Sequence, residues 1–427
     1  MTEISVGSQI FDLVFHPTQA TLYTALLSGE VTGISYNQKG KHQQQFSIKV
    51  SPKSCRAVTL NEDGTKLYVA GKGKGIHTID TETCKVVERR LKAHESPINR
   101  IKHVQPWLFS TGDDDGVIKL WDPRTKESMR TYKHHFDYIT DFLWLPDTKH
   151  LVSTSGDGTL SVLDIRSKKT EPFAHSEDQE DELLSLLSIK GGTKVIVGTQ
   201  IGVLSVFNRS SGWRDCVDRI PGHPHSVEAL CSLPSRLPNV DSSSTILTGS
   251  SDGFLRAVDI FPTRLRGVVA DHGEWPVERI AVGEISRELT LDDNDDGGDK
   301  AVANQEDEDS STAGLWWAGS VGHDEVLKLT DLGSFFAQES ASEDGNEDEQ
   351  QEGEDPSGGD GEDNPVVDED VETASEQEPS EDCDSDDQDE RGDWPKKRKR
   401  KDKDPKSMRN RKAKRDVEVQ GRFFDDL

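Results

Sequence analysis

The feature that most constrains this chain is a residue pair that recurs along its first 331 positions. Each copy places a mostly apolar residue before Asp or Asn, and the first five copies lie 42 to 44 residues apart, followed by intervals of 51 and 72. The copies are Tyr36-Asn37, Ile79-Asp80, Trp121-Asp122, Leu163-Asp164, Phe207-Asn208, Val258-Asp259 and Thr330-Asp331. A fixed period of this length predicts a series of similar structural units.

The clearest unit runs from Ala93 to Asp122. His94 opens it, Ile98 starts a first apolar segment, residues 108–111 form a second, and a tight turn at Asp115-Gly116 leads into a third. This order, from a histidine to a closing Trp-Asp, is the signature of a WD repeat, whose units are four-stranded blades. Seven copies therefore predict an all-β fold, a seven-bladed WD-repeat β-propeller over residues 1–337.

Three places in the repeat depart from the pattern. An acidic insertion at residues 291–312 interrupts the last unit. In the fifth unit, His175 precedes an acidic stretch and Ile201 stands where the turn Asp is expected, so its polar network should be incomplete. A closed ring also needs a final strand, because an open edge promotes aggregation. Either Glu3 to Gly7 or Leu332 to Ala337 could supply it, and the sequence does not choose between them.

Charge separates this body from the C-terminal part of the chain. The net charge is -29, of which about -25 falls in residues 339–393 and about -8 in the insertion, whereas residues 396–415 carry about +11. A segment so rich in Glu, Asp, Ser and Gly cannot bury enough apolar surface to fold. We therefore expect a disordered acidic linker at 338–393 and a basic tail at 394–427.

The cellular compartment of the protein can also be inferred from its sequence. No run of 18 apolar residues exists, the first thirty residues lack a basic leader, and five cysteines show no C-x-x-C spacing. These features argue against a membrane span or secretion and for reduced thiols. Two basic clusters resemble a nuclear or nucleolar import signal. Its candidate residues are Lys396, Lys397, Arg398, Lys399, Arg400, Lys401, Arg409, Arg411, Lys412, Lys414 and Arg415.

Sets of His, hydroxyl and Asp residues repeat in the third, fourth and sixth units. A single such set would suggest a hydrolase triad, but repetition around a ring favours hydrogen bonding that braces each blade. The predicted structural sets are His94, Thr111, Asp115 and Trp121; His135, Ser153 and Asp157; and His223, Thr248 and Asp252. Since no metal-ligand spacing or phosphate loop occurs either, we expect no catalysis, no cofactor and no metal.

Two arginines suggest a different binding role. Arg124 and Arg166 each follow the closing Asp by two residues in consecutive units. This placement is similar to the W-D-x-R box of substrate receptors for cullin-RING ubiquitin ligases, in which the arginine faces the adaptor. An Asp and an Arg at a strand end also pair for ordinary structural reasons.

The order of elements along the whole chain resembles the WD repeat-containing protein 55 family, including its fungal nucleolar members. The elements are the seven units, the split last unit, the acidic segment, the basic block and a terminal Phe423-Phe424 pair. The resemblance implies a non-catalytic nucleolar scaffold, acting in ribosome biogenesis and ribosomal RNA processing as a monomer within a larger complex.

Its expected partners are proteins of pre-ribosomal assembly, with weak RNA contact through the basic tail. The acidic segments also suggest a chaperone for basic nuclear clients such as ribosomal proteins or histones. The ligase receptor and this chaperone are the two alternative functions.

Overall fold

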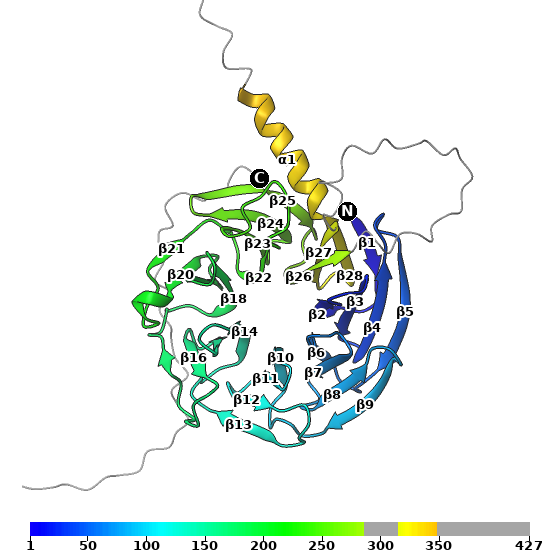
Figure 1. Ribbon diagram of the computed structural model, residues 1–427, viewed down its shortest axis with the longest axis vertical. Coiled ribbons are helices and arrows are strands. Elements are labelled where there is room, and N and C mark those ends of the chain that lie inside the picture. The colour runs from blue at the N-terminus through cyan, green and yellow to red at the C-terminus, as the bar shows by residue number, and fades with distance from the viewer. Residues whose placement is uncertain (286–314, 348–427) are drawn as a thin grey trace, which may run out of the picture. The chain divides into compact units, whose positions relative to one another are not determined.

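The computed structural model describes residues 1–285 and 315–347, with side chains of its last helix described as far as Glu339. Within these residues the strands form seven antiparallel four-stranded sheets. Figure 1 shows the sheets as blades of a ring, with β2, β6, β10, β14, β18, β22 and β26 innermost. The all-β, seven-bladed propeller that the repeat predicted is confirmed.

Blades 1 to 6 are each built from four consecutive strands. Blade 1 contains β2 (Ile10–Phe15), β3 (Thr21–Leu26), β4 (Glu30–Tyr36) and β5 (His42–Lys49); blade 2 contains β6 (Cys55–Leu60), β7 (Lys66–Gly71), β8 (Ile76–Asp80) and β9 (Lys85–Arg90); blade 3 contains β10 (Ile98–Gln105), β11 (Leu108–Asp113), β12 (Ile118–Trp121) and β13 (Ser128–Tyr132). Blade 4 contains β14 (Ile139–Leu145), β15 (His150–Ser155), β16 (Leu160–Asp164) and β17 (Ala174–His175); blade 5 contains β18 (Leu183–Ile189), β19 (Lys194–Thr199), β20 (Leu204–Asn208) and β21 (Asp218–Ile220), with a short 3-10 helix η1 (Arg209–Ser211) before β21; blade 6 contains β22 (Val227–Ser232), β23 (Thr245–Ser250), β24 (Phe254–Ile260) and β25 (Thr263–Asp271).

Blade 7 is assembled from both ends of this body. It contains β26 (Val277–Ile285), β27 (Leu315–Gly322), β28 (Val326–Asp331) and, as its outer strand, β1 (Thr2–Ser5). Thr2 lies opposite Leu329, and the Lys328 ammonium contacts a Glu3 carboxylate oxygen at 2.7 Å. Of the two candidates for closing the ring, the N-terminal segment is therefore the one that does so.

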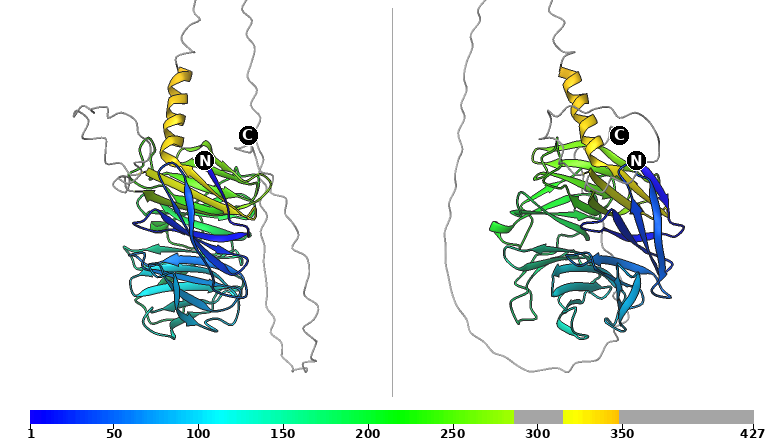
Figure 2. Two further views of the ribbon diagram at one scale, coloured as in Figure 1. Left: turned by 90° about the vertical axis from the view of Figure 1, so that its right-hand side faces the viewer. Right: turned by 45° about the vertical axis from the view of Figure 1, so that its right-hand side comes forward.

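The other candidate, Leu332 to Ala337, is helical. It begins α1 (Leu332–Glu347), whose first turns pack against β25, β27 and β28, where the yellow helix of Figure 2 starts at the ring. Leu332 and Phe336 are fully buried, and Phe335 packs against the same cluster. This spacing of three and four residues matches one helical face. The domain boundary predicted between residues 337 and 338 consequently falls inside a helix.

The hydrophobic core lies between blades. Ile118, Leu120 and Tyr132 of blade 3 pack against Ile139 and Phe142 of blade 4, and the other blade pairs form comparable clusters. Each central strand is consequently covered on both faces, which explains why β11 and β15 are buried throughout and show no polar alternation.

The two strands that flank the acidic insertion pair as far as their last described residues. Ile285 and Leu315, which flank the segment containing it, lie directly opposite each other in the ladder. The predicted insertion at 291–312, and the predicted linker and tail beyond α1, lie outside the described residues.

Candidate functional site

The innermost strand of every blade carries a one-residue β-bulge just after its first paired residue. In β2, Ile10 lies opposite Leu26 and Asp12 lies opposite Ala25, so Phe11 is the extra residue. A bulge redirects its side chain away from the regular ladder. The extra residues of the seven strands are Phe11, Arg56, Asn99, Thr140, Leu184, Glu228 and Glu278.

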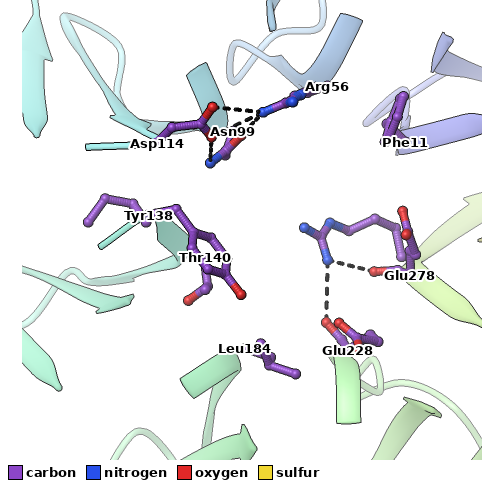
Figure 3. Close-up of a pocket in the computed structure, with 11 residues that line it drawn as sticks. Phe11, Arg56, Asn99, Asp114, Tyr138, Thr140, Leu184, Glu228 and Glu278 are labelled. Carbon is purple, nitrogen blue, oxygen red and sulfur yellow. Dashed lines mark hydrogen bonds and ion pairs between the residues drawn. The ribbon is translucent and has the colours of Figure 1, made fainter. Parts of the chain in front are cut away.

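These seven residues line one cavity of about 310 Å³, together with Asp114, Tyr138, Ile139 and Arg279. Figure 3 shows them converging on it from different blades. The cavity opens at the end of the ring where every innermost strand begins, which we call the mouth face. Its segments are residues 6–9, 27–29, 50–54, 72–75, 91–97, 114–117, 133–138, 156–159, 176–182, 200–203, 221–226, 251–253, 272–276 and 323–325.

One wall of the cavity is electrically balanced. Arg56 donates to Asn99 at 2.6 Å and to an Asp114 carboxylate oxygen at 3.1 Å, and the Asn99 amide donates to the same carboxylate at 2.6 Å. The three side chains come from blades 2 and 3 and form a closed group in Figure 3. Arg56 and Asp114 therefore cancel each other's charge at the cavity.

The opposite wall carries two carboxylates. Arg279 donates to the main-chain oxygens of Glu228 at 3.3 Å and Glu278 at 2.6 Å, and so holds their backbone and not their side chains. The Glu228 carboxylate accepts from the Ser226 hydroxyl, and that of Glu278 contacts the His323 ring. Within the described residues, neither carboxylate has a Lys or Arg within salt-bridge distance.

A second charged layer lies one residue further along the innermost strands. Arg100 contacts Asp141 at 2.8 Å and Asp12 at 3.8 Å, so blade 3 is tied to blades 4 and 1. Burial raises the pKa of Asp12. Burial is also the largest influence at Asp141, but the positive charges of Arg100, Arg279 and Lys102 together outweigh it and lower the pKa. With Arg279, this layer holds two positive and two negative groups and adds no net charge.

The His94 set brings three of its four predicted residues together. The His94 Nε2 atom lies 2.6 Å from the Thr111 hydroxyl, and the Trp121 indole donates to that hydroxyl at 2.8 Å. The carboxylate on His94 Nδ1, at 2.7 Å, belongs to Asp113 and not to the predicted Asp115. Asp113 ends β11 on the same face as Thr111, whereas Asp115 is exposed at the turn and accepts from Ser96.

Blades 4 and 6 vary this arrangement. His135 contacts Asp157 at 3.0 Å, but its nearest hydroxyl is Ser161 at 2.9 Å, which bridges to the predicted Ser153 at 2.7 Å. In blade 6, His223 contacts Thr248 at 2.9 Å, while Asp252 pairs with Arg256 at 2.8 Å. Burial lowers the pKa of His223 to about 3, so this ring is neutral at physiological pH.

Blade 7 contains a further set that was not predicted from the sequence. His272 contacts Asp324 at 2.6 Å and the Ser320 hydroxyl at 2.8 Å. The sequence has the same order of histidine, hydroxyl and Asp as the other sets. The acidic insertion lengthens the separation between His272 and its partners, so this set does not match the spacing of the others.

Blade 5 lacks the histidine itself, whereas the sequence suggested an incomplete network that begins at His175 and lacks the turn Asp. Gln179, four residues before β18, occupies the position that His94 takes before β10. It is buried and donates to an Asp215 carboxylate oxygen at 3.1 Å. His175, the predicted start of this blade, instead ends β17 of blade 4.

The two predicted adaptor-contact arginines lie at the end of the ring away from the mouth face. Arg124 follows β12 and Arg166 follows β16, and their side chains are 76% and 63% exposed. Each forms a fork-like pair with its own closing Asp, Arg124 with Asp122 and Arg166 with Asp164. Each arginine is therefore paired with its own Asp and still exposed at the surface.

The remaining predicted residues fall elsewhere. All import-signal candidates, from Lys396 to Arg415, lie outside the described residues. Over the described ranges, no cluster of three or more metal-ligating side chains occurs, and no helix is long and apolar enough to cross a membrane. Four cysteines of this part, Cys55, Cys84, Cys216 and Cys231, are free.

Comparison with known proteins shows which family shares this sequence. The WDR55 family model matches residues 1–295. A WD repeat-containing protein JIP5 from Laccaria bicolor is 57% identical over 352 residues, covering 80% of this chain and 77% of that protein. WD repeat-containing protein 55 from Bos taurus is 37% identical over 271 residues, covering 63% of this chain and 68% of that protein. The chain belongs to the WDR55 family of WD-repeat proteins.

Proposed function

We propose that this protein is a non-catalytic scaffold of the nucleolus that holds protein partners during ribosome biogenesis and ribosomal RNA processing. The observation that carries the proposal is a set of apolar side chains exposed on the mouth face. These are Leu27 at 50%, Leu91 at 72%, Phe136 at 91%, Ile201 at 56% and Trp275 at 52%. They lie on loops of different blades, and large exposed side chains on one face, the aromatic Phe136 and Trp275 above all, favour a protein-binding role.

The scaffold role also agrees with how polar groups are used. The histidine, hydroxyl and carboxylate groups of blades 3, 4 and 7 contact one another and brace their own blades. A rigid ring presents loops on its faces while its core carries no chemistry. The nucleolar address is assigned to the two basic clusters between Lys396 and Arg415.

The test is localisation of the tagged full-length chain beside a chain that ends at Asp393, with ribosomal RNA precursors followed after depletion. We expect a nucleolar signal for the full chain, its loss on truncation, and accumulation of precursors after depletion. A diffuse full-length signal together with normal precursors would contradict the proposal.

A substrate receptor of a cullin-RING ligase is the second candidate, because both arginines of the W-D-x-R-like motifs are exposed on one face. If it is right, changing both Arg124 and Arg166 to Ala should abolish co-purification with the ligase adaptor. Changing the exposed Lys126 and Lys168 to Ala on the same connections removes equal charge and should leave adaptor capture unchanged. Unaltered capture by the arginine variant would remove this candidate.

A further inference from the structure

We propose that the mouth face binds a lysine- or arginine-rich segment of a partner protein, which lies across its acidic sector and places one cationic side chain beside Glu228 and Glu278. The acidic sector comprises residues 176–182, 272–276 and 323–325 with Glu228 and Glu278. This inference rests on the proposed scaffold function and names the chemistry of its partner.

The charges that line the cavity determine whether it favours a cationic or an anionic ligand. Arg56 is balanced by Asp114, and the buried layer of Asp12, Arg100, Asp141 and Arg279 has no net charge. Glu228 and Glu278 remain, and their carboxylates contact a serine hydroxyl and a histidine ring. Arg279 and Arg100 attract Glu278 without forming a salt bridge to it. The cavity therefore presents two carboxylates that no Lys or Arg of the described residues contacts directly, and a guanidinium or ammonium group complements them.

The walls of the cavity suit the rest of such a side chain. Phe11, Leu184 and Tyr138 line the space beside the two glutamates. Lys and Arg carry long apolar stems that pack on such surfaces while their charged ends stay polar. The Tyr138 hydroxyl donates to Glu182 at 2.8 Å and so places another carboxylate next to this wall.

The surrounding loops extend the same charge. Segments 176–182, 272–276 and 323–325 contain eight Asp and Glu residues and no Lys or Arg. Glu177 pairs with Arg214 and Asp324 with His272, whereas Glu180 and Glu274 are exposed. In contrast, the mouth-face segments of blades 2 and 3 carry four lysines, Lys53, Lys72, Lys74 and Lys92, against the three acids Glu95, Asp114 and Asp115. A basic segment is thus attracted to blades 5 to 7 more strongly than to the opposite side of the ring.

Apolar anchors lie on the same face. Phe136, Ile201 and Trp275 belong to loops of blades 4, 5 and 7, and each exposes more than half of its surface. Aromatic residues of this kind dominate binding energy at interfaces. The partner segment should therefore interleave apolar side chains with its basic ones.

The basic tail of this chain is a less suitable occupant. Residues 396–415 directly follow residues 339–393, whose charge of about -25 is much closer along the chain than the mouth face. A segment from another protein has no such attached competitor. We therefore assign the site to a partner.

The test measures binding of a short fluorescent peptide, in which arginine alternates with leucine, to the full-length protein at physiological salt. Changing Glu180 and Glu274 together to Lys should weaken binding by roughly tenfold or more, or about 1.4 kcal/mol. The matched control changes the exposed Glu127 and Glu171 to Lys on the opposite face and should alter affinity by less than about twofold. Because the acidic linker is identical in all these proteins, it cancels from the comparison.

Three further variants sharpen the result. Glu228→Gln with Glu278→Gln, and Phe136→Ser with Trp275→Ser, should each weaken binding, whereas Trp107→Ser on the opposite face should not. Equal weakening by both charge-reversal pairs would overturn the proposal, because net charge alone would then explain binding. Removal of residues 394–427 that tightens binding tenfold would assign the sector to the chain's own tail and overturn the partner assignment. Neither outcome bears on localisation or precursor processing, which test the scaffold proposal separately.

Discussion

Blades 3 and 7 each contain a buried network of histidine, hydroxyl and carboxylate but obtain it from differently organised sequence. In blade 3, His94 and Asp113 are 19 residues apart and their side chains lie 2.7 Å apart. In blade 7, His272 and Asp324 are 52 residues apart, with the insertion between them, yet their distance is 2.6 Å. The outer strand of blade 7 even comes from the other end of the body. The network thus does not need continuity of the chain, and its carboxylate comes from the end of β11 in blade 3 but from the turn after β27 in blade 7.

Of the changes considered, removal of the outer strand of blade 7 should lower stability most. Deletion of residues 2–5 removes the buried Ile4 side chain and leaves β28 as an open edge. We expect a loss of about 3 kcal/mol or more in the free energy of unfolding, measured with urea. The milder Ile4→Ala change should cost about 2 kcal/mol or more. Unchanged stability in both would show that β1 does not close the ring in solution.

Removing the network histidine should test whether the two networks are energetically equal. His94→Ala leaves Asp113 and Thr111 without their ring partner, and His272→Ala does the same to Asp324 and Ser320. Each change should cost about 3 kcal/mol, because each strands buried polar groups. The control His42→Ala, at an exposed position, should cost less than about 0.5 kcal/mol. A much smaller loss for His272 than for His94 would show that continuity does matter.

Acid should weaken the histidine networks. Burial lowers the pKa of His94 and that of His223, the latter to about 3. Because the unfolded chain then binds more protons than the folded one, stability is complete above about pH 6.5 and falls as the pH drops toward the folded value. Each histidine contributes a slope of up to about 1.4 kcal/mol per pH unit.

The measurement for this prediction is the urea midpoint between about pH 7 and pH 5, compared with His223→Gln. The variant should be less stable at neutral pH but show a shallower decline. A slope identical to that of the parent would mean that His223 does not titrate as its burial requires.

Replacing residues 291–312 with a short Gly-Ser linker should have the smallest effect. Ile285 and Leu315 pair across the segment, so the ladder does not need the insertion. The free energy of unfolding should change by less than about 0.5 kcal/mol. A large loss would reveal that the insertion supports blade 7.

The repeat predicted the blades well, because each closing pair marks the third strand of its sheet. The network was predicted where the spacing was uninterrupted, as at His94 and Thr111, and was missed at His272. Asp115 was predicted in place of Asp113 because both precede the turn glycine, and the equivalent turn residues Asp157 and Asp324 do contact the histidines of their blades. The strand that closes the ring could not be predicted, because the apolar residues of Leu332 to Ala337 suit a strand as well as a helix.

The cavity could not be predicted from sequence. Phe11, Arg56 and Glu228 share no residue type, and a bulge is a property of pairing and not of composition. Their common role becomes visible only when the register of all seven innermost strands is compared.

The pairing of Thr2 with Leu329 also has a consequence for synthesis. Of the described strands, β1 leaves the ribosome first and is the last to find its neighbour. At a synthesis rate of about 5 to 20 residues per second, roughly 15 to 65 seconds pass between the emergence of Thr2 and that of Leu329. During that interval the nascent propeller is an open arc with two unsatisfied edges. Its escape from aggregation therefore depends on how quickly its ends meet once synthesis has passed Asp331.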